Sequence, residues 1–178
     1  GIIHGTGNDL SDTPVVMLNG GPGGSSATTI AIFEENPDFT LAPVLEDRDV
    51  IVFDQRGTGF SEPALFCPGD LPPGEDELFG DLTIEEIAEM ETEEFAQLCA
   101  DRVTEMTDLR AYNTIEVAQD MNDVITALDY EQVDLWGQSY GTRVALEAMR
   151  QLPEDAIRSV VLESVLPPQA DFLEGPYV

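Results

Sequence analysis

At residues 133–146 the chain reads Val-Asp-Leu-Trp-Gly-Gln-Ser-Tyr-Gly-Thr-Arg-Val-Ala-Leu, and this stretch decides the fold. Its first half is apolar enough for a buried strand, and apolar residues recur at helical spacing after Gly141. Ser139 therefore falls in a tight turn between a strand and a helix, which is a nucleophile elbow. Such a turn requires small residues at the positions of Gly137 and Gly141. We predict Ser139 as a nucleophile and the Tyr140 N–H, at the helix start, as a donor to a developing negative charge.

A glycine-rich turn follows the buried strand that the pattern predicts over residues 13–18. Residues 19–26 read Asn-Gly-Gly-Pro-Gly-Gly-Ser-Ser, and so many glycines leave backbone N–H groups open to a ligand. The glycine spacings of phosphate loops and dinucleotide-binding loops are both absent. The turn fits an oxyanion hole better than a merely flexible loop, with the Gly21 N–H as the second donor and with Gly20 and Pro22 shaping the turn.

A third motif comes after the strand predicted over residues 49–54. Residues 55–63 read Gln-Arg-Gly-Thr-Gly-Phe-Ser-Glu-Pro, which predicts a loop at the carboxyl edge of the sheet, where α/β folds place their ligand sites. We expect Arg56 to hold this loop by pairing with Asp54 or with another carboxylate. This role is structural and not catalytic.

The remaining pattern alternates strands and helices. Helices are predicted over residues 26–34 and 112–128, and a further strand over 157–162. Asn113 is a suitable N-cap for the second helix, whose apolar stripe comprises Ile115, Ala118, Met121, Ile125 and Leu128. The pattern predicts an α/β protein with a parallel sheet flanked by helices, in one domain over 1–178. An excursion at about 64–104 contains a Pro/Gly-rich part and an acidic amphipathic helix over 82–103.

The chain has two cysteines, Cys67 and Cys99, which flank this excursion. A disulfide between them would staple the excursion and would indicate an oxidising compartment, hence a secreted or periplasmic protein. Two buried free thiols, which fit a cytoplasmic protein, are equally open. Because no other metal-ligand pattern accompanies them, we expect no zinc site, and the sequence indicates no cofactor.

The charge is strongly one-sided. Against 36 acidic residues stand 7 basic ones, and the net charge is −29. A field this negative repels nucleic acid and anionic membranes, and no apolar run is long enough to cross a bilayer, so neither partner is expected. Because the acidic residues are scattered, we interpret them as a solvated surface suited to a salty habitat.

Together, the motifs at residues 19–24, 54–63 and 137–141 resemble the α/β-hydrolase family of prolyl iminopeptidases and tripeptidyl-aminopeptidase-like enzymes. The resemblance spans nearly the whole chain. It implies serine hydrolysis with Ser139 as nucleophile and an oxyanion hole from Gly21 and Tyr140, acting on peptides or small esters. Asn19 stands where many members have histidine, at a position that is not the catalytic base.

The departure from this family concerns the catalytic base. In this fold the acid and the histidine follow the serine, yet the only histidine is His4, which we expect to be partly exposed and not catalytic. The family's cap, acid and histidine would lie beyond Val178 and its first strands before Gly1, so the sequence resembles a central fragment or one chain of a split enzyme. Glu163 stands where some α/β-hydrolases keep their acid, but we expect no catalytic role for it.

Two functions remain open. The first is a serine hydrolase that forms an acyl-enzyme on Ser139, with a possible second chain supplying the acid, the histidine and the cap. The second is a non-catalytic binding module with an α/β-hydrolase-like fold. The substrate is not predicted, because the cap that would recognise it is not in the sequence.

Overall fold

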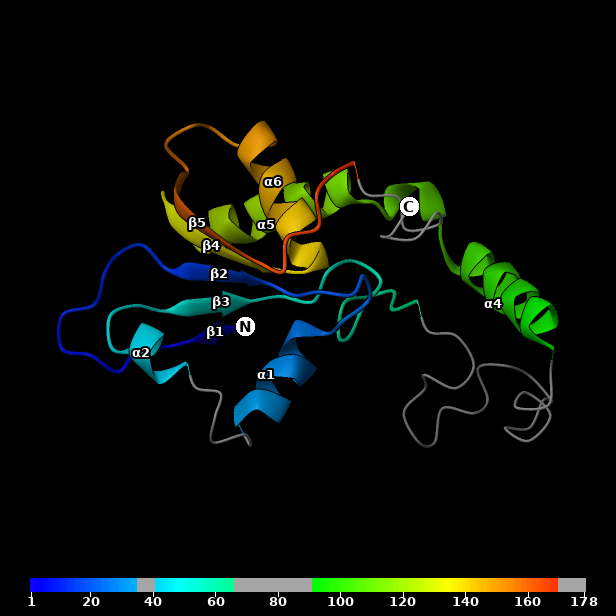
Figure 1. Ribbon diagram of the computed structural model, residues 1–178, viewed down its shortest axis with the longest axis horizontal. Coiled ribbons are helices and arrows are strands. Elements are labelled where there is room, and N and C mark those ends of the chain that lie inside the picture. The colour runs from blue at the N-terminus through cyan, green and yellow to red at the C-terminus, as the bar shows by residue number, and fades with distance from the viewer. Residues whose placement is uncertain (35–40, 66–90, 170–178) are drawn as a thin grey trace.

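The computed structural model describes residues 1–34, 41–65 and 91–169. In this part of the chain a five-stranded sheet has the order β1-β3-β2-β4-β5 (Figure 1). Its strands are β1 (Ile2–Ile3), β2 (Val15–Leu18), β3 (Val50–Val52), β4 (Val133–Gln138) and β5 (Ile157–Glu163). Strands β2 to β5 confirm the predicted ones, whereas the short strand β1 was not predicted.

The sheet is parallel except at one edge. Strands β2, β3, β4 and β5 run parallel, and β1 pairs antiparallel with β3. In the central register Val16 lies beside Ile51 and Leu135, and all three side chains are buried. Parallel strands need cover on both faces, which explains why these strands read as apolar runs in the sequence.

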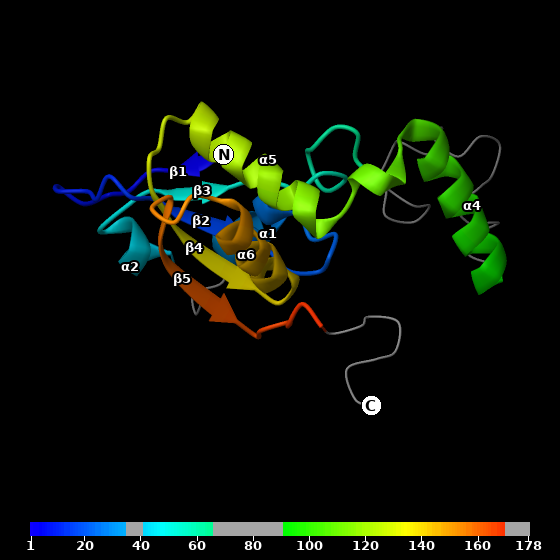
Figure 2. The same ribbon diagram turned by 90° about the horizontal axis from the view of Figure 1, so that it is seen from above.

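Helices cover the two faces. Helices α5 (Thr114–Ala127) and α6 (Tyr140–Gln151) lie on one face, and α1 (Ser26–Glu34) and α2 (Ala42–Leu45) lie on the other (Figures 1 and 2). The core under α5 and α6 contains Leu18, Met121 and Val144, while the core on the opposite face contains Met17 and Val52. The predicted α/β architecture is therefore confirmed.

Helix α5 begins and packs largely as predicted. The Asn113 side chain accepts hydrogen bonds from the N–H groups of Ile115 and Glu116, so it is the N-cap. The prediction that Ile115 and Leu128 belong to the buried stripe is wrong, because they are 52% and 37% exposed. The buried stripe is centred near Met121, and at 3.6 residues per turn Ile115 lies about 120° around the helix from Met121.

Helix α4 (Thr92–Met106) extends away from the sheet in both ribbon views (Figures 1 and 2). It corresponds to the end of the predicted acidic helix, whose residues 82–90 lie outside the described part. A short 3₁₀ helix, η2 (Leu109–Ala111), joins it to α5. Cys99 on α4 is disulfide-bonded, whereas Cys67 lies outside the described residues.

Within the described ranges, no helix is both long enough and apolar enough to cross a bilayer. In the same ranges, no group of three or more His, Cys, Asp or Glu side chains is arranged so that it could bind a metal ion.

Candidate active site

The predicted nucleophile lies between strand and helix. Strand β4 ends at Gln138 and α6 begins at Tyr140, so Ser139 is the single residue between them. Its φ of 51° and ψ of −117° are dihedrals that a non-glycine residue adopts only when its surroundings enforce them. The Ser139 N–H donates to the Glu163 carbonyl (2.9 Å), and the Thr142 hydroxyl donates to the Ser139 carbonyl (2.6 Å). These bonds brace the strained turn from β5 and from the first turn of α6.

Gly137 and Gly141 lie where backbones approach closely. A Cβ atom on Gly137 would lie 2.7 Å from the Gly141 carbonyl oxygen, so α6 leaves no room for a side chain there. A Cβ atom on Gly141 would overlap the Leu18 carbonyl and lie 2.6 Å from its carbon. Gly141 is therefore confined by the end of β2, a contact that the sequence pattern did not indicate.

The glycine-rich turn lies against the elbow. A Cβ on Gly20 would stand 3.2 Å from the Ser139 Cβ and 3.7 Å from its Oγ. Gly21 has a φ of 118°, which only glycine adopts readily, and its peptide bond to Pro22 is cis. The fold therefore brings Ser139, Tyr140 and the turn around Gly21 together at the carboxyl edge of the sheet.

Asp54 joins two loops at this edge. One carboxylate oxygen accepts hydrogen bonds from the Ser25 hydroxyl and from the Ala27 N–H, each 3.1 Å long. The other oxygen accepts from the Phe60 N–H at 2.9 Å. Asp54 thus ties the start of α1 to the loop that follows β3.

The carboxylate partner of Arg56 is Asp120 and not Asp54. Its guanidinium forms a two-pronged ion pair with Asp120 on α5, with distances of 2.7 and 2.6 Å, and donates to the Ala111 carbonyl. The hydrogen bonds that Arg56 donates to Asp120, opposed by burial, are the main reason that the pKa of Arg56 is raised. The partner is thus the other carboxylate that the sequence left open, and the loop after β3 is held against α5.

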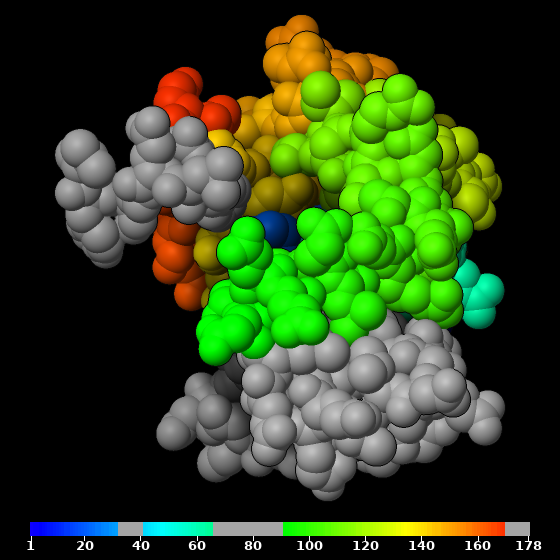
Figure 3. All heavy atoms as spheres, turned by 90° about the vertical axis from the view of Figure 1, so that its right-hand side faces the viewer, coloured from blue at the N-terminus to red at the C-terminus, as the bar shows by residue number. Residues whose placement is uncertain are grey.

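A cavity of about 290 Å³ opens beside the elbow. Pro22 and Gly23 of the glycine turn line it together with Tyr112 and Tyr140. Figure 3 shows the molecule from the side to which the strands point in Figure 1, and blue atoms from the N-terminal part of the chain are visible there in a hollow between green and gold segments. The hydroxyl of Tyr140 lies 2.9 Å from that of Thr114, so this side chain points toward α5.

His4 and Glu163 do not join Ser139 as catalytic partners. His4 follows β1 and lies 3.3 Å from Asp49, which directly precedes β3, so it is at the amino edge of the sheet. Six residues of β4 separate the two edges, on the order of 20 Å at strand spacing. The Glu163 carboxylate accepts a hydrogen bond from the Trp136 indole at 3.3 Å.

Two buried polar residues of the site were not assigned a role from the sequence. The Asn19 side chain donates to the Ser25 carbonyl (3.2 Å) and to the Thr29 hydroxyl (2.9 Å). The Gln55 side chain donates to the Asn19 carbonyl at 3.2 Å. A signal existed, because a polar residue directly after a buried strand must find a hydrogen-bond partner.

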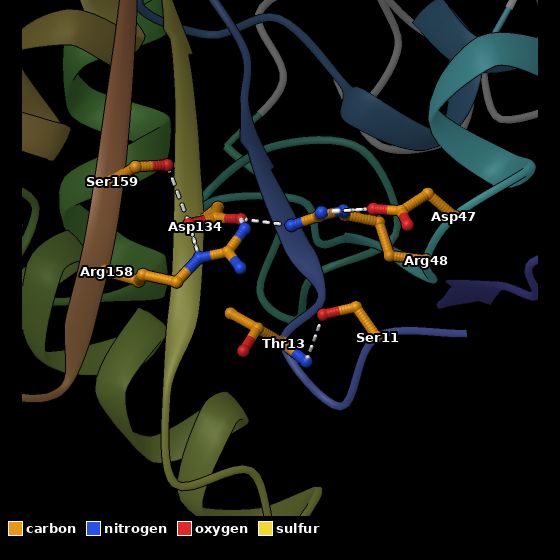
Figure 4. Close-up of polar contacts among 7 residues, drawn as sticks. All are labelled: Ser11, Thr13, Asp47, Arg48, Asp134, Arg158 and Ser159. Atoms are coloured by element: carbon orange, nitrogen blue, oxygen red, sulfur yellow. Dashed lines mark hydrogen bonds and ion pairs between the residues drawn. The ribbon is translucent and has the colours of Figure 1, made fainter. Parts of the chain in front are cut away.

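A second polar cluster lies at the opposite edge (Figure 4). Asp134, buried on β4, accepts hydrogen bonds from Arg48 (2.5 Å), Arg158 (3.0 Å) and Ser159 (2.7 Å). Burial alone would raise the Asp134 pKa, but the bonds from Arg158 and Ser159 and the two arginine charges outweigh it, so the pKa is lowered. Arg48 also pairs with Asp47. The cluster ties β5, β4 and the start of β3 together.

The fold and the elbow define a class. Residues 13–176 match the family described by the α/β hydrolase fold, so the chain belongs to this family. The resemblance that the motifs indicated is therefore confirmed.

Among curated relatives is the serine protease Hip1 of Mycobacterium tuberculosis, 30% identical over 168 residues, which covers 90% of this chain and 31% of that protein. The tripeptidyl aminopeptidase of Streptomyces lividans is 30% identical over 174 residues, covering 95% of this chain and 32% of that protein. The chain thus spans about a third of the length of these relatives.

Solved structures agree on the fold. The proline iminopeptidase of Mycobacterium smegmatis has a TM-score of 0.50 at 21% identity, covering 89% of this chain and 38% of that one. An esterase from Exiguobacterium antarcticum has a TM-score of 0.50 at 19% identity, covering 91% of this chain and 39% of that one.

Proposed function

We propose that this chain carries the nucleophile of a serine hydrolase that releases residues or short peptides from peptide N-termini, or cleaves small esters. The observation that carries the proposal is the strained Ser139 at the N-terminus of α6, with the glycine turn directly beside it. The names of the curated relatives, a serine protease and a tripeptidyl aminopeptidase, favour the peptide substrate.

The chemistry follows from this arrangement. The Ser139 hydroxyl attacks a carbonyl carbon and forms a tetrahedral intermediate whose oxygen carries a negative charge. The N–H groups of Tyr140 and Gly21, together with the positive end of the α6 dipole, stabilise that charge. Collapse of the intermediate breaks the carbonyl–nitrogen or carbonyl–oxygen bond of the substrate, and the amine or alcohol leaves with the proton that the general base took from Ser139. The acyl-enzyme that remains on Ser139 is then hydrolysed by water.

The general base lies outside the sequence in this proposal. A serine hydroxyl needs an imidazole to take its proton, and His4 is at the opposite edge of the sheet. Asp54 already accepts three hydrogen bonds that hold loops. The acid and histidine, and the cap that selects the substrate, therefore come from further residues of the same protein or from a second chain.

The test compares two proteins on an activated ester, nitrophenyl acetate. Chain 1–178 should hydrolyse it barely above background, and a version that includes a downstream acid and histidine should be faster by at least about 10³-fold. Ser139→Ala is measured in both proteins as the control.

Two outcomes would contradict the proposal. Robust turnover by 1–178 that disappears in Ser139→Ala would show that the base is within this sequence. Full activity of Ser139→Ala in the longer protein would remove Ser139 as the nucleophile.

A further inference from the structure

The glycine turn of the site is pinned at both of its ends. Its first end, Asn19, follows β2, and its last end, Ser25, precedes α1. The Asn19 side chain bridges the two ends by donating to the Ser25 carbonyl at 3.2 Å and to Thr29 on α1 at 2.9 Å. The five residues between them, four of them glycine, have little conformational preference of their own. Their shape therefore depends on what holds the ends.

Two consecutive residues after β3 hold those ends from outside. Asp54 accepts from the Ser25 hydroxyl at 3.1 Å, and Gln55 donates to the Asn19 carbonyl at 3.2 Å. Gln55 is only 4% exposed, so water does not compete for the hydrogen bond between its amide and the Asn19 carbonyl. The Asn19 carbonyl also faces the elbow, because a Cβ on Gly141 would lie 2.9 Å from it.

We infer that Gln55 is a positioning residue, which fixes the Gly21 N–H relative to Ser139 by holding the carbonyl of Asn19. The Asn19 carbonyl belongs to the peptide that leads into Gly20, and Gly20 stands directly against Ser139. When Gln55 holds this carbonyl, the plane of the Asn19–Gly20 peptide is set. The following peptide, which carries the Gly21 N–H, then starts from a fixed Gly20. Without that bond, the glycines let the peptide rotate, and the donor to the oxyanion is misplaced. This inference rests on the proposed function.

The chain offers a matched control. The Gln132 side chain also donates to a backbone carbonyl, that of Asp155, at 2.7 Å, but at the amino edge of the sheet. Gln55→Met and Gln132→Met each remove one amide donor and keep the length of the side chain. Only the first should affect chemistry at Ser139.

The experiment uses the complete hydrolase, with its acid and histidine in place. Gln55→Met should lower kcat by about 10- to 100-fold and leave KM within about twofold, because the oxyanion forms only after the substrate is bound. The inhibition constant of a peptide boronic acid, which forms a tetrahedral adduct on serine, should rise by the same factor as kcat/KM falls. Gln132→Met should change none of these quantities.

Three results would overturn the inference. They are an unchanged kcat in Gln55→Met, a change in KM alone, or an equal loss in Gln132→Met.

If Gln55→Met does not fold, Gln55→Asn decides, because it keeps a buried amide but withdraws it from the Asn19 carbonyl by one methylene. Ser139→Ala in the same assay separates the two proposals, since full activity there contradicts the proposed function, whereas its loss leaves Gln55 to be judged alone.

Discussion

Different kinds of contact stabilise the two edges of the sheet. At the carboxyl edge, backbone groups and small residues surround Ser139. The backbones approach so closely there that Gly137 and Gly141 have no room for a side chain. At the amino edge, side chains of opposite charge meet around Asp134, between Arg48 and Arg158 (Figure 4). The surroundings of Ser139 are defined by shape and those of Asp134 by charge.

This difference separates chemistry from stability. A reaction that generates a negative charge at Ser139 is helped by N–H groups and hindered by a free carboxylate nearby, and the Asp54 carboxylate is occupied by three donors. The amino edge is free of that constraint, so buried charges can join strands there. Substitutions at the glycines around Ser139 should therefore act through atomic overlap, and substitutions at Asp134 through charge and pH.

The largest effect is expected at Gly141. Helix propensity alone predicts that Gly141→Ala stabilises the protein by about 1 kcal/mol. The new Cβ would instead overlap the Leu18 carbonyl, so β2 or α6 must move, and we expect a loss of about 3 kcal/mol in the free energy of unfolding. Urea denaturation of both proteins measures the difference.

Gly23→Ala is the matched control, because its Cβ meets nothing within 4 Å and only its φ of 104° is unfavourable. That substitution should cost about 1–2 kcal/mol. Equal losses in the two variants would mean that the approach of β2 to α6 is not tight, and the contrast between the edges would fail.

A smaller and pH-dependent effect is expected at Asp134. Asp134→Asn removes the negative charge between two arginines and should cost about 2–3 kcal/mol at pH 7. The pKa of Asp134 is lowered in the folded state from an ordinary value of 3.8, so its stabilisation is complete above that value and is lost as the pH falls through the lowered one. The gap between wild type and variant should therefore shrink below about pH 4.

The gap is measured by urea denaturation of both proteins from pH 7 down to pH 3. Asp108→Asn is the control, because the Asp108–Arg110 pair is solvent-exposed, and it should leave the denaturation midpoint unchanged. A gap at Asp134 that stays constant down to pH 3 would mean that the carboxylate charge is not what ties the strands together.

The sequence predicts the carboxyl edge better than the amino edge, and the reason is the range of the interactions. The elbow at Ser139, the strand before it and the Asn113 cap are encoded within a few neighbouring residues, and each was found from local patterns. Asp134 meets Arg48 across 86 positions and Arg158 across 24. These contacts depend on strand order and register, which no local pattern gives.

The dependence on long-range contacts also explains three smaller differences between the predictions and the structure. The sequence showed that Arg56 needed a carboxylate, but the choice of Asp120 depends on where α5 lies over the sheet. The sequence showed that Gly141 must be small, but its neighbour proved to be Leu18 on β2. Ile115 has the right spacing for a buried stripe, yet α5 is rotated so that Met121 is central and Ile115 is at the margin.

The smallest effect is expected at His4. His4 is the only histidine in the sequence, so replacing it tests directly whether the amino edge contributes to chemistry at the carboxyl edge. Its side chain is 77% exposed and contacts Asp49, whereas the Gly5 N–H makes the shorter bond to the same carboxylate at 2.7 Å. His4→Gln should therefore change the free energy of unfolding by less than about 0.5 kcal/mol. Because His4 is on the order of 20 Å from Ser139, it cannot take a proton from the hydroxyl. Ester hydrolysis by 1–178 and by the longer protein should be the same with and without the substitution, and a fall in either rate would show that the two edges are coupled.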